Sequence, residues 1–179
     1  MKSAVLIIDL QIGLFEEEGK PFDFNNVIER VNKITSHARK SNLPVIFIQY
    51  EQVKGALQFG SSGWHLVPDL LTETSDFYVR KTTPNSFVKT DLNELLVQHS
   101  IKKLIICGYA TEFCVDSTIR GGAALGYSIH IASDAHTTHD KKHASAEFIR
   151  NHHNETLCNI TSFGVPIKAI TTEEIINKG

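Results

Sequence analysis

The sequence predicts an α/β protein of three layers, in which a mostly parallel sheet is covered by helices on both faces. Short apolar runs rich in β-branched residues alternate along the chain with segments whose apolar residues follow helical spacing. The runs are apolar throughout rather than at every second residue, which indicates strands buried on both faces. The expected strands lie at residues 4–8, 45–50, 76–81, 104–108, 127–132 and 165–170.

The first strand-helix-strand unit occupies the N-terminal part of the chain. The apolar run 4–8 stops at Asp9, and a loop-like segment follows it. Asn25 or Asn26 can then cap a helix that runs to about Lys40. The next apolar run closes the unit, and its crossover is expected to be right-handed.

The middle of the chain contains a long loop and a short strand. Residues 51–71 hold three glycines and a proline without periodicity, and long loops inside compact domains are usually functional. The third expected strand ends at Lys81. Asp91, followed three residues later by Glu94, is typical of a capping box, so a helix is expected to begin there.

The second half of the chain continues the alternation of strands and helices. Helical spacing begins at Val115, directly after Cys114, and continues to Gly126. Asp140 can cap a further helix that runs toward Leu157, ahead of the last expected strand. The carboxyl ends of all the parallel strands should therefore meet at one edge of the sheet.

Composition narrows the class of protein. With 179 residues, 41% hydrophobic content and a net charge of -2, the chain suits one globular domain over residues 1–179 and offers no basic surface for nucleic acid. Its apolar runs fall far short of the roughly 20 residues that span a membrane, and no secretory signal pattern is present, so a cytoplasmic location is expected. Three cysteines without a C-x-x-C pair argue against a disulfide framework.

The stretch 104–118 places a thiol at the expected start of a helix. An apolar strand rises into Gly108, a short polar turn follows, and helical spacing begins just after Cys114. A helix N-terminus carries partial positive charge and unpaired N–H groups, which favour a thiolate and can stabilise an oxyanion. Cys114 is therefore the candidate nucleophile, and its alternative role is that of a small buried apolar residue.

Asp9 and Lys81 come at the ends of two other expected strands, so topology should bring them to the same edge as Cys114. Asp9 could act as the base for the thiol, while Lys81 could keep Asp9 ionised, orient it and favour the thiolate. With N–H groups of the 108–114 turn, this set would support attack on an amide or ester carbonyl and hydrolysis of the resulting acyl-enzyme. Taken singly, Asp9 could equally be a cap, and Lys81 could face solvent.

Four segments of the chain form a distinctive combination. They are residues 4–11 (Ala-Val-Leu-Ile-Ile-Asp-Leu-Gln), 81–87 (Lys-Thr-Thr-Pro-Asn-Ser-Phe), 108–115 (Gly-Tyr-Ala-Thr-Glu-Phe-Cys-Val) with Thr118 and Arg120, and 133–135 (Ser-Asp-Ala). Together they resemble the isochorismatase-like cysteine hydrolases, over about residues 3–140 and in the order in which that family has them. The segment 108–115 is the most diagnostic of the four.

The resemblance implies a six-stranded, Rossmann-like parallel sheet of order 3-2-1-4-5-6 and a triad of Asp9, Lys81 and Cys114. It also implies a cis peptide bond between Tyr109 and Ala110, with an oxyanion hole formed by the N–H groups of Ala110 and Cys114. The implied activity is hydrolysis of a C–N bond in a small amide, ureide or carbamoyl compound, without a cofactor. The implied assembly is a homodimer or a homotetramer.

Departures from the family's patterns narrow the choice. Nicotinamidases of this family carry an Asp-x-His metal motif where this chain has Gln49-Tyr50-Glu51, so no metal site is expected. Isochorismatases proper lack the cysteine. The best match is the short, metal-free group with a Gly-Ser-rich loop and a tryptophan, here residues 60–65. A metal held by His136, His139 and His143 is disfavoured, because zinc sites of such spacing usually bring a further ligand.

The expected small-molecule pocket is apolar. Trp64, Phe15, Phe87 and Phe113 could line it, with Gln11 as a polar handle, although Phe87 and Phe113 could equally belong to the core. Nicotinamidase is the alternative within the enzyme class. A catalytically silent binding module on the same fold and a general redox protein are the alternatives outside it, and the second lacks a resolving cysteine close in sequence.

Overall fold

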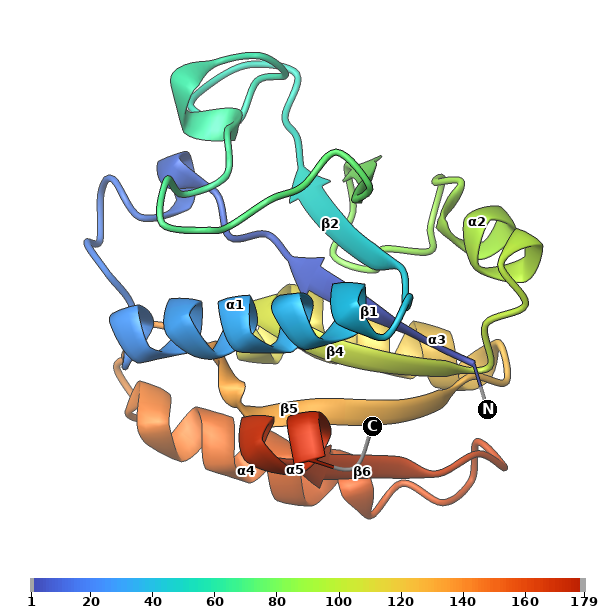
Figure 1. The fold of residues 1–179 in the computed structure, drawn as a ribbon. Helices are drawn as coiled ribbons and strands as arrows, with labels where there is room; N and C mark the ends of the chain where they lie inside the picture. The colour runs from blue at the N-terminus through green and yellow to red at the C-terminus, as the bar shows by residue number, and fades with distance from the viewer. Residues whose placement is uncertain (1, 178–179) are drawn as a thin grey trace.

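A computed structural model describes residues 2–177, so the predicted domain limits at residues 1 and 179 lie outside the described residues. Six parallel strands form one sheet in the order β3-β2-β1-β4-β5-β6, which confirms the predicted fold class and strand order (Figure 1). The strands are β1 (Ser3–Ile8), β2 (Val45–Tyr50), β3 (Phe77–Lys81), β4 (Lys103–Tyr109), β5 (Ser128–Thr137) and β6 (Ile167–Ile170).

Helices cover both faces of the sheet. α1 and α5 pack on one face, and α2, α3 and α4 pack on the other (Figure 1). The α-helices are α1 (Phe24–Lys40), α2 (Leu92–Gln98), α3 (Asp116–Ala124), α4 (Ala146–Cys158) and α5 (Thr172–Asn177). Short 3-10 turns occupy Ile12–Leu14 and Ser62–Trp64, and a π-helical turn occupies Thr111–Val115. Among residues 2–177, no helix has the length and apolar character to cross a bilayer.

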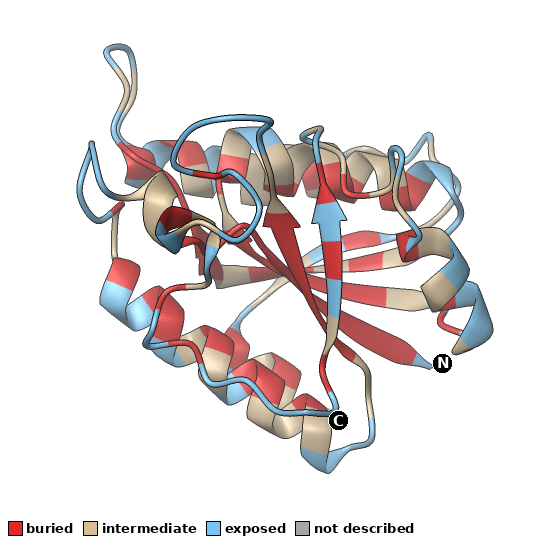
Figure 2. Cartoon of the chain, turned by 90° about the horizontal axis from the view of Figure 1, so that it is seen from above, coloured by how far each residue is buried: buried red, intermediate tan, exposed pale blue. Residues whose placement is uncertain are grey.

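Two hydrophobic cores lie on either side of the sheet. Because successive side chains of a strand point to opposite faces, Val5 and Ile7 of β1 pack with α1, while Leu6 and Ile8 pack with α3. Figure 2 shows the result as buried residues along the central strands and the inner faces of the helices. Each fully buried aliphatic side chain contributes about 1.5–3 kcal/mol, so these two layers hold the strand ends in place.

Helix starts agree only in part with the sequence expectation. α1 begins at Phe24, after Asp23 in the left-handed region at φ 56°, so the predicted caps Asn25 and Asn26 lie inside the helix. α2 begins at Leu92, directly after Asp91 as expected, but the Asp91 side chain makes no capping hydrogen bond. The hydroxyl of Thr90 instead accepts from the N–H of Leu92 at 3.3 Å. In both helices the residue at the N-cap position makes no capping hydrogen bond with its side chain.

α4 also begins later than expected. It starts at Ala146, and Ser145 caps it by accepting a hydrogen bond from the N–H of Phe148 at 3.2 Å. The predicted cap, Asp140, still contacts the helix start, because its Oδ1 accepts from the N–H of Ala146 at 2.8 Å. The final helix, α5, was not expected from the sequence.

Candidate active site

Three side chains from different elements meet at the carboxyl edge of the sheet. Asp9 follows β1, Lys81 is the last residue of β3, and Cys114 lies in the π turn that follows β4. The Nζ of Lys81 donates to Oδ2 of Asp9 at 2.6 Å, and the two side chains are 0% and 2% exposed. The convergence inferred from topology is therefore present in the fold.

Asp9 has one carboxylate oxygen held and one available. Oδ2 is engaged by Lys81, whereas Oδ1 is buried without a hydrogen-bond partner in the part of the chain that the structure describes. Burial raises the pKa of Asp9 above its usual range, and the Lys81 ammonium and the Cys114 thiol both act against that rise. A buried carboxylate with a raised pKa is a stronger base than a carboxylate in water, and Oδ1 of Asp9 is the oxygen that can accept a proton.

Asp9 also has an unusual backbone. Its φ is 47°, in the left-handed region where non-glycine residues are uncommon and aspartate is among the better tolerated. Its N–H donates to the carbonyl of Ile48 on β2 at 3.0 Å, which anchors the conformation. The chain thus turns sharply at the end of β1 and presents the carboxyl toward Lys81.

Cys114 is a thiol rather than a thiolate in this structure. Burial and the negative charge of Asp9 raise the pKa of the Cys114 thiol to about 12, and together they outweigh the Lys81 ammonium. Lys81 lowers the pKa of this thiol, as expected, but it does so by less than burial and Asp9 raise that pKa.

The turn at residues 108–115 carries the candidate nucleophile Cys114 and is named the nucleophile turn. Gly108 and a π-helical turn give it its shape. Gly108 has φ 119°, and a Cβ there would lie 2.2 Å from the carbonyl oxygen of Ile8, so only glycine fits. The Tyr109–Ala110 peptide bond is cis, as the resemblance implied. The carbonyl of Ala110 accepts from the N–H groups of Phe113 and Val115 at 3.1 Å each, which closes the turn.

The position of Cys114 differs in one respect from the expected helix start. The helical turn begins at Thr111, and Cys114 is the fourth residue of a π turn that leads into α3. π turns are rare and frequently occur at functional sites. Cys107, by contrast, is fully buried in β4, and burial raises the pKa of its thiol to about 12.

Gln11 does not serve as a polar handle for a ligand. Its side chain is fully buried, and its Nε2 donates to the carbonyls of Tyr50 and Trp64 at 2.9 and 2.8 Å. Its Oε1 accepts from the N–H of Tyr50 at 2.8 Å. Because these backbone groups satisfy the amide, Gln11 ties the end of β2 to the 51–71 loop.

Phe15 and Phe87 belong to opposite layers rather than to one pocket. Phe15 packs against Phe24 and Tyr109, with ring centroids 5.0 Å apart in each case, on the α1 face. Phe87 stacks on Tyr127 at 6.0 Å on the other face. For Phe87, the interpretation as a core residue is the one that fits its contacts.

Trp64 and Phe113 also have separate surroundings. Trp64 packs edge-on against Phe59 at 4.8 Å, and its Nε1 is buried without a partner among the described residues. Phe113 is 54% exposed, with the Lys141 ammonium 5.5 Å from its ring centre. The four aromatic residues therefore do not form the single apolar pocket that the sequence suggested.

Residues beside the nucleophile turn were not singled out by the sequence. Glu112 accepts from the hydroxyl of Thr138 at 2.9 Å and pairs with Lys141 at 3.4 Å, while its second oxygen is buried without a partner among the described residues. No spacing in the sequence signals these contacts, because the 138–141 segment reaches the turn only through the tertiary fold. Across residues 2–177, no three His, Cys, Asp or Glu side chains are gathered closely enough to hold a metal ion.

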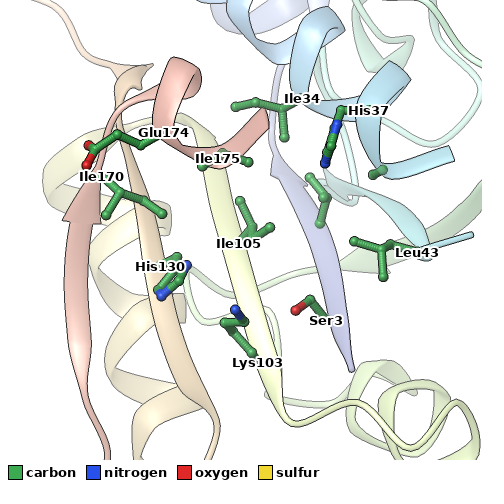
Figure 3. Close-up of a pocket in the computed structure, with 12 residues that line it drawn as sticks. Ser3, Ile34, His37, Leu43, Lys103, Ile105, His130, Ile170, Glu174 and Ile175 are labelled. Atoms are coloured by element: carbon green, nitrogen blue, oxygen red, sulfur yellow. The ribbon is translucent and has the colours of Figure 1, made fainter. Parts of the chain in front are cut away.

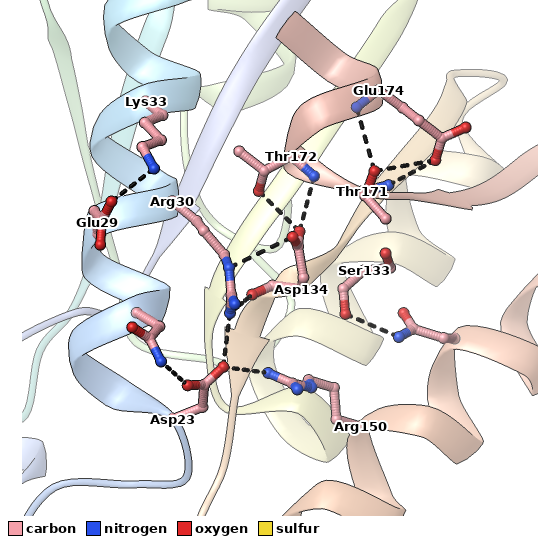
Figure 4. Close-up of polar contacts among 12 residues, drawn as sticks. Asp23, Glu29, Arg30, Lys33, Ser133, Asp134, Arg150, Thr171, Thr172 and Glu174 are labelled. Atoms are coloured by element: carbon pink, nitrogen blue, oxygen red, sulfur yellow. Dashed lines mark hydrogen bonds and ion pairs between the residues drawn. The ribbon is translucent and has the colours of Figure 1, made fainter.

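Asp134, within the 133–135 segment, has a structural set of contacts (Figure 4). Its carboxylate lies 3.5 Å from Arg30 Nε and accepts from the N–H and hydroxyl of Thr172 at 2.9 and 2.8 Å. Arg30 also pairs with Asp23 at 2.6 Å. Asp134 therefore joins α1 and α5 to β5.

A cavity of about 100 Å³ opens on the α1 and α5 face, and it lies at the other end of the sheet (Figure 3). Ser3 and Lys103, which begin β1 and β4, mark that end. Its walls include none of the three converging residues. The catalytic edge and this cavity are therefore separate features of the fold.

Comparison with known proteins identifies the family. The model of the isochorismatase domain matches residues 3–161. The chain belongs to the isochorismatase family. A crystal structure of an isochorismatase family protein, 34% identical, superposes with a TM-score of 0.86 over 94% of this chain and 98% of the other.

Hydrolases are among the curated relatives in this isochorismatase family. Streptothricin hydrolase of Streptomyces noursei is 28% identical over 138 residues, which cover 76% of this chain and 55% of that protein. Ureidoacrylate amidohydrolase RutB of Pseudomonas syringae is 27% identical over 202 residues, covering 90% of this chain and 78% of the relative. Members of the family are thus hydrolases, and some of them are amidohydrolases.

Proposed function

We propose that this protein is a cysteine hydrolase that cleaves a C–N bond in a small amide, ureide or carbamoyl compound through an acyl-enzyme. Cys114 is the nucleophile, Asp9 the base and Lys81 the cation that holds Asp9. The observation that carries the proposal is the buried ion pair between Lys81 and Asp9 at 2.6 Å. Oδ1 of Asp9 has no hydrogen-bond partner among the described residues, and the Cys114 thiol lowers the pKa of this carboxyl group.

Acylation follows from the state of the two groups. Because the thiol keeps its proton at neutral pH, its transfer to Asp9 accompanies the formation of the sulfur–carbon bond. The carbonyl oxygen becomes an oxyanion, for which the N–H groups of Ala110 and Cys114 are the proposed donors. The C–N bond then breaks, and the amine leaves with the proton that Asp9 had taken.

Deacylation uses the same carboxylate. A water molecule attacks the thioester, and Asp9 takes a proton from it as the carbon–oxygen bond forms. When the sulfur–carbon bond breaks, the acid product leaves and the sulfur regains its proton from Asp9. The Lys81 ammonium keeps Asp9 aligned through both halves of the cycle, and no metal or cofactor takes part in the proposed steps.

The substrate class rests on the family and on the named relatives. Streptothricin hydrolase and ureidoacrylate amidohydrolase are hydrolases of nitrogen-containing small molecules by their names. We propose that this protein acts in the cytoplasm as a homodimer or a homotetramer. Analytical ultracentrifugation of the purified protein tests the assembly, and a single monomeric species would contradict it.

The test of the activity is mass spectrometry of the intact protein during turnover. Wild type, Cys114→Ala and Cys158→Ala are each mixed with a panel of small primary amides, ureides and carbamoyl amino acids, and ammonia release is recorded. Cys158 is a second half-buried free cysteine, on α4, so its variant controls for the loss of a thiol. We expect turnover and an acyl adduct in wild type and Cys158→Ala, and neither in Cys114→Ala.

Two outcomes would contradict the proposal. Turnover that survives in Cys114→Ala would show that another group attacks the substrate. Absence of turnover across the panel, together with tight binding of one of its compounds, would instead support a binding module on this fold.

A further inference from the structure

A break in strand register brings one histidine to the nucleophile turn. β4 and β5 pair regularly up to Ile106 and Ile131, but two residues later Gly108 pairs with His136. In an unbroken ladder Gly108 would face residue 133, so β5 carries three extra residues at this point. Such irregularities occur next to active sites and re-aim a side chain, and here the re-aimed side chain is that of His136.

His136 lies in a chain of side-chain hydrogen bonds with a determined direction. The side-chain Nδ2 of Asn154 on α4 donates to the carbonyl of Ser133 at 3.0 Å, the bond marked at Ser133 in Figure 4. A carbonyl only accepts, so the amide of Asn154 cannot be reversed. Its Oδ1 therefore faces Nε2 of His136 at 3.0 Å, which makes that nitrogen the donor.

The direction of the remaining hydrogen bonds follows from the Nε2–H tautomer of His136. With the proton on Nε2, Nδ1 of a neutral His136 has a lone pair, and it lies 2.9 Å from the hydroxyl of Thr111. The Thr111 hydroxyl must then donate to it. Burial lowers the pKa of His136 to about 4, so the imidazole is neutral at physiological pH and this direction holds.

Thr111 is the first residue of the π turn that contains Cys114. Thr111 and His136 are 0% and 1% exposed, so neither can exchange its partner for water. An unmade hydrogen bond at such a place costs about 1–3 kcal/mol, which is enough to favour a single orientation of the turn. The next residue of the turn, Glu112, accepts a hydrogen bond through its Oε1 from the hydroxyl of Thr138, two residues after His136, at 2.9 Å.

We propose that His136 is a positioning residue: through its hydrogen bond from Thr111, it fixes the start of the π turn and thereby the place of the Cys114 sulfur beside Asp9. The expected effect of His136 on turnover rests on the proposed function. The expected effect of His136 on the reactivity of the Cys114 thiol does not depend on any substrate.

Two substitutions of His136 separate the two ends of the imidazole. Asparagine places an acceptor near the position of Nδ1 and loses the contact to Asn154, whereas glutamine reaches toward the position of Nε2 and loses the acceptor for Thr111. A second pair of variants tests the partner: Thr111→Ser keeps the hydroxyl, and Thr111→Val removes it at nearly equal volume. Melting temperatures of all four variants report on structural damage alone.

The main readout is the rate at which iodoacetamide alkylates Cys114 at pH 9, followed by peptide mass mapping. We expect His136→Gln and Thr111→Val to slow alkylation by about tenfold, as the loss of one hydrogen bond of about 1.4 kcal/mol would do. His136→Asn and Thr111→Ser should stay within about threefold of wild type. The double variant His136→Gln with Thr111→Val should be no slower than either single variant.

Turnover of whichever amide the wild type hydrolyses gives the second readout. The same two variants should lower kcat with little change in KM, because the turn places the nucleophile and the oxyanion donors, which act mainly in the transition state. Equal losses in His136→Asn and His136→Gln, or melting temperatures that fall while alkylation stays unchanged, would overturn the inference. If the alkylation pattern is as expected but no amide is hydrolysed, the positioning role stands and the proposed hydrolase activity fails.

Discussion

Two adjacent residues of β3 make ion pairs of the same length in opposite surroundings, and this contrast predicts the effect of Lys81→Met. Lys81 lies 2.6 Å from Asp9 with 0% and 2% of the side chains exposed, while Arg80 lies 2.6 Å from Glu51 with 48% and 20% exposed. Removing one partner of a buried pair leaves an uncompensated charge and costs about 3–5 kcal/mol. We expect Lys81→Met to lose that much unfolding free energy at pH 7.5.

The matched control is Arg80→Met. Its pair is exposed to solvent, so its loss should be small and should vanish at high salt, whereas the loss for Lys81→Met should be almost independent of salt. Urea denaturation of wild type and both variants at low salt and at about 0.5 M salt measures both effects. The m-value shows whether the variants still unfold between comparable states.

The pH dependence gives a further check on the same variant. The pKa of Asp9 is raised in the folded state, so its protonation favours folding, and this contribution is present in acid and lost as pH rises above the usual aspartate value of 3.8. Without the Lys81 ammonium, the pKa of Asp9 in the folded state is raised further. The gap in stability between wild type and Lys81→Met should therefore widen from pH 4 to pH 8. A gap that is constant with pH, or no larger than that of Arg80→Met, would refute the reasoning.

Three other predictions concern the thiol, a glycine and the buried glutamine. Alkylation of Cys114 by iodoacetamide should rise with pH up to at least pH 10 without a plateau near neutrality, because burial and Asp9 raise its pKa to about 12. Gly108→Ala should cost at least about 3 kcal/mol in urea denaturation, since its Cβ would meet the backbone of β1 at 2.2 Å, whereas Gly126→Ala, with φ 89° and open space, should cost about 1–2 kcal/mol. Gln11→Leu should cost about 2–4 kcal/mol and speed proteolysis of the 51–71 loop, because the N–H and carbonyl of Tyr50 lose their partner; a loop as resistant as in wild type would contradict this.

Sequence reasoning was most accurate for the central strands. The limits of β2 were predicted to the residue, because a β-branched run buried on both faces is bounded clearly by polar or turn residues. It was least accurate for the starts of α1 and α4 and for β5, which extends to Thr137 instead of ending near residue 132. The extension depends on a register shift with β4, which no local pattern encodes.

The expected pocket shows a related limit. Aromatic residues near a candidate site could be assigned to a pocket only by type, and type does not say which face of the sheet they join. Phe15 and Phe87 joined opposite faces, and Gln11 found backbone partners from two other segments. Partners that lie about 40 to 50 residues away along the chain are invisible to spacing arguments.

The layered parallel sheet follows from sequence patterns alone. So does the meeting of Asp9, Lys81 and Cys114 at one edge, because parallel strands all end on the same side and each of these residues closes or follows one. The raised pKa of Cys114 and the place of His136 depend instead on tertiary contacts. The thiol's pKa depends on how much water neighbouring segments remove and on a carboxylate more than a hundred residues away in sequence. The position of His136 depends on three extra residues that the ladder between β4 and β5 accommodates.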